Sequence, residues 1–192
     1  FHASAIRGNL ALPEGLEYID TYAFSGCSGL TGSLTIPGGV KVISSYAFDN
    51  CGFTGNLTLP MGLTEIQSYA FSYTKFKGEL NIPSTVTTIG ARAFGTTEFN
   101  GTLVLPEELI SLGSYVFEGC RRLSGVVEIP ENVVAIPSAL FSGCSNIEGI
   151  VLQKHIEVIE SYAFVHCYYV SSIVCKAKNP PTIASNSFYG VA

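Results

Sequence analysis

Phenylalanine recurs at a single position of a repeating unit along the whole chain. Nine of the twelve phenylalanines stand 23 or 24 residues apart, and the other three, Phe53, Phe76 and Phe99, each follow five residues after one of the nine. A period of this length is typical of repeat architectures, in which each unit buries its apolar residues only by stacking on its neighbours. The sequence therefore predicts one solenoid spanning all 192 residues. The nine regularly spaced residues are Phe1, Phe24, Phe48, Phe71, Phe94, Phe117, Phe141, Phe164 and Phe188.

The repeating unit also carries the signs of its local structure. It reads G-x-L-x-L-P-x-x-L-x-x-I-x-x-Y-A-F-x-x-C-x-x-L. The L-x-L alternation predicts a short strand whose apolar side chains point inward, and the proline after it ends the strand because it lacks an N–H. The Ala-Phe segment predicts a tight helical turn. The inward pairs are Leu10/Leu12, Leu34/Ile36, Leu57/Leu59, Leu80/Ile82, Leu103/Leu105, Val127/Ile129 and Ile150/Leu152.

These elements define the expected fold class and its division. We expect an α/β-type leucine-rich-repeat solenoid, a right-handed superhelix of coils of 23–24 residues, with a parallel β-sheet on one face and short helical turns or irregular structure on the other. Residues 1–7 form a partial N-terminal repeat, residues 8–172 form seven repeats, and residues 173–192 form a C-terminal capping repeat. Pro180 and Pro181 cannot donate to a further coil, which favours a cap. Because the chain starts in mid-repeat at Phe1, without a methionine, we expect more sequence upstream in the parent protein.

Composition and motifs argue against several classes of function. Only 13% of the residues are charged, the net charge is −5, and the ten Lys and Arg residues are scattered, so the clustered positive charge that nucleic-acid binding requires is missing. No apolar run approaches the roughly 18 residues of a membrane span. The sequence has no phosphate-binding loop, dinucleotide fingerprint or nucleophile elbow, and its His residues, at positions 2, 155 and 166, do not have metal-ligand spacing. We therefore expect no enzyme activity, no cofactor and no metal.

Cysteines share a column three residues after the phenylalanine. Thr74 and Thr97 occupy this column in the two coils that lack cysteine. Equivalent residues of stacked coils point in parallel, at about the 4.8 Å coil spacing, which exceeds the mean Cβ separation of about 3.8 Å in a disulfide. The pattern predicts buried, reduced thiols, and Cys175, in the strand of the capping repeat, receives the same interpretation. The column consists of Cys27, Cys51, Cys120, Cys144 and Cys167.

The string I-P-x-x-V-x-x-I-x-x-x-A-F-x-x-C, which runs from Ile36 to Cys51, resembles the BspA-like (Treponema pallidum-type) leucine-rich repeats. The closing segment 179–182, followed by Phe188, is similar to the last repeat of many bacterial members. The resemblance implies a non-catalytic, protein- or glycan-binding module of a bacterial cell-surface or secreted protein, active in adhesion to host or microbial molecules. The alternative is a structural spacer that displays another domain and has no ligand of its own. We expect a monomer, with the open N-terminal repeat as the place for self-association.

Two surfaces are candidates for binding an extracellular protein or glycan. The first is a tyrosine column two residues before the repeat phenylalanine, which offers either a stripe of half-exposed rings or rings that merely lie over the neighbouring coil. The second is the outward side of the strand sheet, which is small, polar and nearly free of aromatic residues, and which could also be no more than a solvated face. The first column contains Tyr22, Tyr46, Tyr69, Tyr115 and Tyr162, and the second surface is represented by Asn9, Thr35, Thr58, Asn81 and Thr102.

Overall fold

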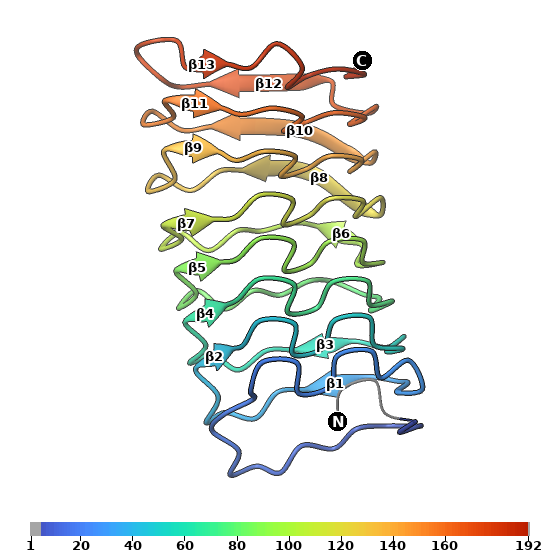
Figure 1. Cartoon of the computed structure of the whole chain (residues 1–192). Helices are drawn as coiled ribbons and strands as arrows, with labels where there is room; N and C mark the ends of the chain where they lie inside the picture. The colour runs from blue at the N-terminus through green and yellow to red at the C-terminus, as the bar shows by residue number, and fades with distance from the viewer. Residues whose placement is uncertain (1–4, 192) are drawn as a thin grey trace.

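In the computed structural model, the chain winds into about seven stacked coils of about 23 residues each (Figure 1). The structure describes residues 5–191, so Phe1 lies outside the described residues. The coils follow one another from the N-terminal to the C-terminal end, and each contacts the coils on either side of it. The solenoid predicted from the phenylalanine period is confirmed.

One face of the stack consists of short parallel strands. Leu34 pairs with Leu57 and Ile150 pairs with Ile173, so equivalent positions of the repeat lie side by side at these pairs. The register shifts around β8, where Gly101 pairs with Leu123 and the pairing with the next strand is irregular between Ile147 and Gly149. The strands form two sheets, in the orders β1-β3 and β12-β10-β8-β6. Their bounds are β1 Leu34–Thr35, β3 Leu57–Thr58, β6 Gly101–Thr102, β8 Leu123–Glu128, β10 Ile147–Leu152 and β12 Ser172–Cys175.

The expected strands are not all formed. No strand is present at the Leu10/Leu12 and Leu80/Ile82 pairs within the described residues, although Leu80 is buried. Leu103 and Leu105 are buried as well, yet they follow β6 instead of lying in it. An alternation of two apolar residues specifies which side chains face inward, but not how many backbone hydrogen bonds the ladder contains.

A second row of parallel strands, which the sequence pattern did not predict, follows the proline turn. In Figure 1 these strands run in the opposite direction to the first row. Each is two residues long, and its inward residue belongs to the isoleucine column, as Ile66 and Ile89 show. The bounds are β2 Val42–Ile43, β4 Glu65–Ile66, β5 Thr88–Ile89, β7 Ser111–Leu112, β9 Ala135–Ile136, β11 Val158–Ile159 and β13 Thr182–Ile183, in the sheet orders β2-β4-β5-β7 and β13-β11-β9.

The segment around each phenylalanine is not helical, so the predicted helical turn is wrong: residues 5–191 contain no helix. From Phe24 to Phe164, the residues two positions before and two positions after the phenylalanine take left-handed backbone conformations, as in Tyr46 with φ 58° and Asn50 with φ 52°. The Ala47 N–H donates locally to Ser44 at 3.2 Å, whereas the Phe48 N–H donates to Ala70 of the next coil at 2.9 Å. Left-handed residues four positions apart, on either side of the phenylalanine, interrupt the helical path and direct hydrogen bonds between coils. We call this side of the solenoid the turn edge.

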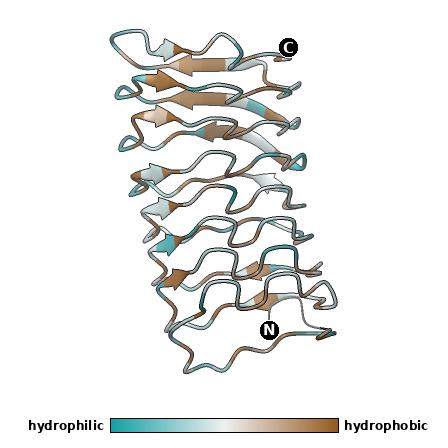
Figure 2. Ribbon diagram, viewed as in Figure 1, coloured by the Kyte–Doolittle hydropathy of each residue, from teal (hydrophilic) through white to brown (hydrophobic). Residues whose placement is uncertain are grey.

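The core contains two columns of stacked phenylalanine rings. From Phe24 to Phe188 successive rings are 5.2–5.9 Å apart and nearly parallel. A shorter column of Phe53, Phe76 and Phe99 meets the first edge-on at 6.1–6.2 Å, a favourable geometry for aromatic pairs. In Figure 2, hydrophobic colouring predominates along β10 and β12. Most residues of β10 are buried, whereas all four residues of β12 are exposed.

The cysteine column lies against this core, and the prediction of buried, free thiols is confirmed for its five members. The Cys51 thiol donates to the carbonyl oxygen of Phe24 at 3.0 Å, and Cys144 does the same to Phe117 at 3.0 Å. Burial raises the pKa of Cys51 to about 12. For Cys175 the thiol is free as predicted, but the predicted burial is wrong, because this cysteine is exposed. It lies in β12, the edge strand of its sheet, with no further strand paired beyond it.

Candidate functional site

The tyrosine column lies along the turn edge, in a backbone conformation that non-glycine residues rarely adopt. All five tyrosines have positive φ, between 58° and 65°. The column is held there by hydrogen bonds between coils: the Tyr46 N–H donates to Ser68 at 3.0 Å and the Tyr69 N–H donates to Ala91 at 2.8 Å. The side chains therefore leave the backbone at the same angle in each coil.

The rings stack on one another while part of each stays accessible. Tyr22 and Tyr46 are 4.7 Å apart, Tyr46 and Tyr69 are 4.5 Å apart, and both pairs are nearly parallel. Arg92 occupies the next position, with its guanidinium 4.5 Å from the centre of the Tyr115 ring. Tyr22 is 45% exposed, and the middle rings are half-buried. We call the set Tyr22, Tyr46, Tyr69, Arg92 and Tyr115 the tyrosine ladder.

Both interpretations of the tyrosine column thus describe part of its geometry. The rings do lie over neighbouring coils, and they also present a continuous, partly exposed edge. Desolvation raises the pKa of the Tyr46 phenol, and the adjacent Tyr69 and Tyr22 add to the shift. Tyr162 is 50% exposed and stands apart from the ladder, because Ala139 fills the intervening coil.

The outward side of the first row of strands is the second candidate surface. Its representatives are all exposed, and none of them is charged or aromatic. Toward the C-terminal half the same face changes character: a hollow of about 610 Å³ brings together apolar and acidic side chains from separate coils. Glu107 and Glu108 line the same hollow as Glu128 and Glu131 of the following coil, a grouping that no single repeat indicates. The hollow is lined by Val104, Val126, Glu107, Glu108, Glu128 and Glu131, among others.

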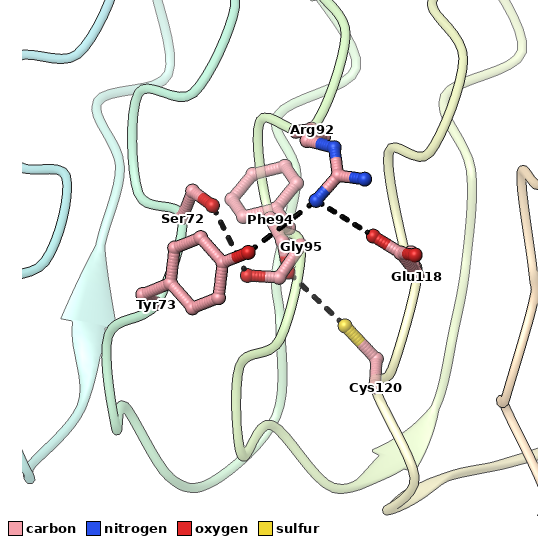
Figure 3. A network of polar contacts seen from close by, with 7 residues as sticks. All are labelled: Ser72, Tyr73, Arg92, Phe94, Gly95, Glu118 and Cys120. Carbon is pink, nitrogen blue, oxygen red and sulfur yellow. Dashed lines mark hydrogen bonds and ion pairs between the residues drawn. The ribbon is translucent and has the colours of Figure 1, made fainter.

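A polar network on the turn edge was not predicted either (Figure 3). Arg92 forms an ion pair with Glu118 at 2.9 Å, and the same nitrogen donates to the Tyr73 hydroxyl at 3.4 Å. Beneath it, the Cys120 thiol donates to Phe94 at 3.1 Å. Because these residues come from three consecutive coils, no local sequence motif indicates the network. The only sign in the sequence is that Arg92 replaces tyrosine in its column.

Within residues 5–191, no group of three or more His, Cys, Asp or Glu side chains could hold a metal ion. The same residues contain no helix with the length and apolar character needed to cross a membrane. His166 and Cys167, although adjacent, face different ways, since Cys167 is buried and His166 is exposed and bonded to the Tyr168 hydroxyl at 2.8 Å.

Comparisons with known proteins agree with this architecture. The family model of the BspA type leucine-rich repeat region, written for six copies, matches residues 1–123 and 98–192. None of the curated proteins matches the chain.

Solved structures of bacterial leucine-rich-repeat proteins share the fold. One from Bacteroides ovatus is 24% identical, with a TM-score of 0.73, and the match covers 92% of this chain and 46% of that protein, so the chain spans about half of its length. The leucine-rich-repeat protein of T. pallidum is 28% identical, with a TM-score of 0.67, and the match covers 84% of this chain and 77% of that one. A protein from Eubacterium ventriosum is 19% identical, with a TM-score of 0.57 and coverage of 88% and 72%.

Proposed function

The chain belongs to the family of BspA-type leucine-rich-repeat proteins, and from this premise we propose that it is a non-catalytic binding module of a bacterial cell-surface or secreted protein. Its partner is an extracellular protein or glycan of host or microbial origin. Solenoids offer extended surfaces built from repeated positions, and these surfaces are what such proteins use for recognition.

The observation that carries the proposal is the tyrosine ladder. Tyrosine offers a large contact area, few rotatable bonds and a polar tip, which makes it a frequent contact residue at interfaces. Stacking at 4.5–4.7 Å already fixes the rings of Tyr22, Tyr46 and Tyr69 before a partner arrives. Ordering a mobile side chain at an interface costs about 0.5–1.5 kcal/mol of binding free energy. Because these rings are already ordered, binding loses little of its free energy in this way.

The outward face of the strands supports binding less strongly. Thr35, Thr58 and Thr102 are exposed and can hydrogen-bond, but they provide no anchor that fills a pocket. We assign this face a secondary role at most.

A binding panel tests the proposal. Immobilised chain is presented with extracellular-matrix proteins, mucin and a glycan array, and saturable binding is compared between the wild type and Tyr46→Asn/Tyr69→Asn. Asparagine suits the left-handed backbone at these positions, so the variant removes the rings without adding backbone strain. We expect affinity to fall by at least about tenfold, as it does when central contact residues are removed.

The matched control is Thr35→Asn/Thr58→Asn, which makes two polar changes in the same coils on the strand face. It should retain the affinity of the wild type. A loss in this control but not in the ladder variant would move the site to the strand face. Absence of saturable binding across the panel would favour the spacer alternative, and turnover in a hydrolase screen would contradict the non-catalytic assignment.

A further inference from the structure

The turn edge carries a hollow of about 820 Å³ that runs beside the tyrosine ladder and shares Arg92 with it. Part of its lining is the column two residues after the repeat phenylalanine, in which every residue from Gly26 to Gly190 is left-handed. Thr96, Gly119 and Gly143 are small members of this column and leave space over successive coils, whereas Tyr73, in the same column, and Arg92, beside it, are large. The column members that line the hollow are Asn50, Tyr73, Thr96, Gly119 and Gly143.

The charges around this hollow differ from those of the chain as a whole. The chain carries a net charge of −5, yet four of its ten basic residues line this one hollow, together with only two carboxylates. Glu118 pairs with Arg92 at 2.9 Å, and Glu98 lies 3.7 Å from Arg122. Among the described residues no ion pair is formed by Lys75 or Arg121, which are both exposed. Two cations are therefore available to a ligand, and local positive charge attracts anions.

We propose that this hollow binds an acidic glycan, meaning a carbohydrate chain that carries carboxylate or sulfate groups; this inference rests on the binding role proposed above. Lys75 and Arg121 contact the anionic groups, and Tyr73 provides a platform for a sugar ring. Tyr73 is 48% exposed, and its hydroxyl is held by Arg92 at 3.4 Å, so the ring is already oriented.

The shape and lining of the hollow favour a glycan over a protein. Tight protein partners insert apolar anchors into well-packed pockets, but the side chains here are mostly short and polar or charged, and Tyr73 is the one aromatic residue among them. A pyranose in an extended chain is about as long as the spacing between coils, about 4.8 Å, so successive sugars can meet equivalent positions of successive coils. Hydroxyls of Thr96 and Ser142 and the amide of Asn50 then face sugar hydroxyls.

The test is titration of the intact chain with three carbohydrate probes: heparin oligosaccharides, which are sulfated, polygalacturonate oligosaccharides, which are carboxylated, and neutral dextran. We expect saturable binding of at least one acidic probe, weakening as salt is raised, and none of dextran. Lys75→Gln/Arg121→Gln should reduce affinity at least tenfold. Lys154→Gln/Lys178→Gln removes the same charge elsewhere and should leave affinity within twofold.

A second variant distinguishes a built site from diffuse attraction. Tyr73→Asn changes no charge and places in the column a residue already found there at Asn50. It should weaken the acidic probe at least threefold. Equal affinities of the charge variant and its control, or no binding of either acidic probe, would overturn the inference. If the acidic probes fail but the chain binds other members of the earlier binding panel through the tyrosine ladder, only the acidic-glycan site is refuted and the proposed function stands. If no member of that panel and no acidic probe binds, both the site and the proposed function are refuted.

Discussion

Raising the pH from 8 to 10 should destabilise the protein through two buried thiols, and replacing both by threonine should remove that part of the loss. Burial raises the pKa of Cys51 and of Cys167 from the ordinary value of 9.0 to about 12. A thiol whose pKa is higher in the folded state favours folding fully below pH 9. That contribution is lost as the pH rises from 9 toward 12, because the unfolded chain then releases protons that the folded chain retains.

The magnitude follows from the two pKa values. At pH 10 an unfolded thiol is mostly ionised while the folded one is still protonated, which costs about 1.4 kcal/mol for each thiol and about 3 kcal/mol for the pair. Threonine is the natural replacement, because Thr74 and Thr97 occupy the same column in other coils. Their hydroxyls donate to the carbonyls of Phe71 and Phe94 at 2.7 and 3.0 Å, and threonine at the cysteine positions has an equivalent carbonyl.

The assay is urea unfolding followed by circular dichroism at pH 8 and pH 10. Between these values the free energy of unfolding of the wild type should fall by about 3 kcal/mol more than that of Cys51→Thr/Cys167→Thr. All other ionisable groups are the same in both proteins, so their contributions cancel in the comparison. Cys175→Ser, at the exposed cysteine, serves as the control and should behave as the wild type does. Equal losses in the wild type and the double threonine variant would refute the reasoning.

Three further predictions concern the core, the turn edge and the thiols. Phe94→Ala should lower the free energy of unfolding by about 3–5 kcal/mol, because its fully buried ring stacks on Phe71 and Phe117. Phe188→Ala, at a half-buried ring with one stacking partner, should lower it by less than half as much in the same urea titration. Equal losses of unfolding free energy in the two variants would contradict the stacked core. Thr96→Asn should raise the free energy of unfolding by up to about 1 kcal/mol, and with it the melting temperature, because it replaces a β-branched residue at φ 58° with one that tolerates this conformation. A lower melting temperature would count against backbone strain at this position. Labelling with a thiol-reactive disulfide reagent at pH 8 should modify Cys175 rapidly and the five buried cysteines only after unfolding; a second fast thiol in the folded protein would show that the cysteine column is accessible.

The repeat period specified more of the fold than any local motif did. A phenylalanine every 23 or 24 residues predicted stacked coils, and the rings do form one column. The same column argument predicted buried, free thiols for Cys51 and its equivalents. Predictions of local structure were less accurate. The segment at Ala47-Phe48 was predicted to be a helical turn, but it is a series of turns with left-handed residues. The two-residue strand Val42–Ile43 was not predicted. Only Ile43 of this strand is buried, so no pair of alternating apolar residues marked it.

The candidate surfaces were only partly predictable for a related reason. The sequence shows which columns face inward, because burial requires apolar residues at fixed positions of every coil. The outward arrangement depends on which coils become neighbours and on how the backbone directs each side chain. Tyr46 and Tyr69 were visible as one column, but their stacking at 4.5 Å was not. The hollow that gathers Lys75, Arg92 and Arg121 from three coils had no sign in any single repeat.

The sequence by itself determined the family, the repeat length and the identity of the core columns, because a solenoid repeats the same burial requirement in every coil. Only the tertiary structure decided which exposed side chains meet. Those contacts cross from one coil to the next, over about 23 residues of sequence, and no local pattern selects for them. The tyrosine ladder and the hollow beside it therefore became recognisable only once the coils were stacked.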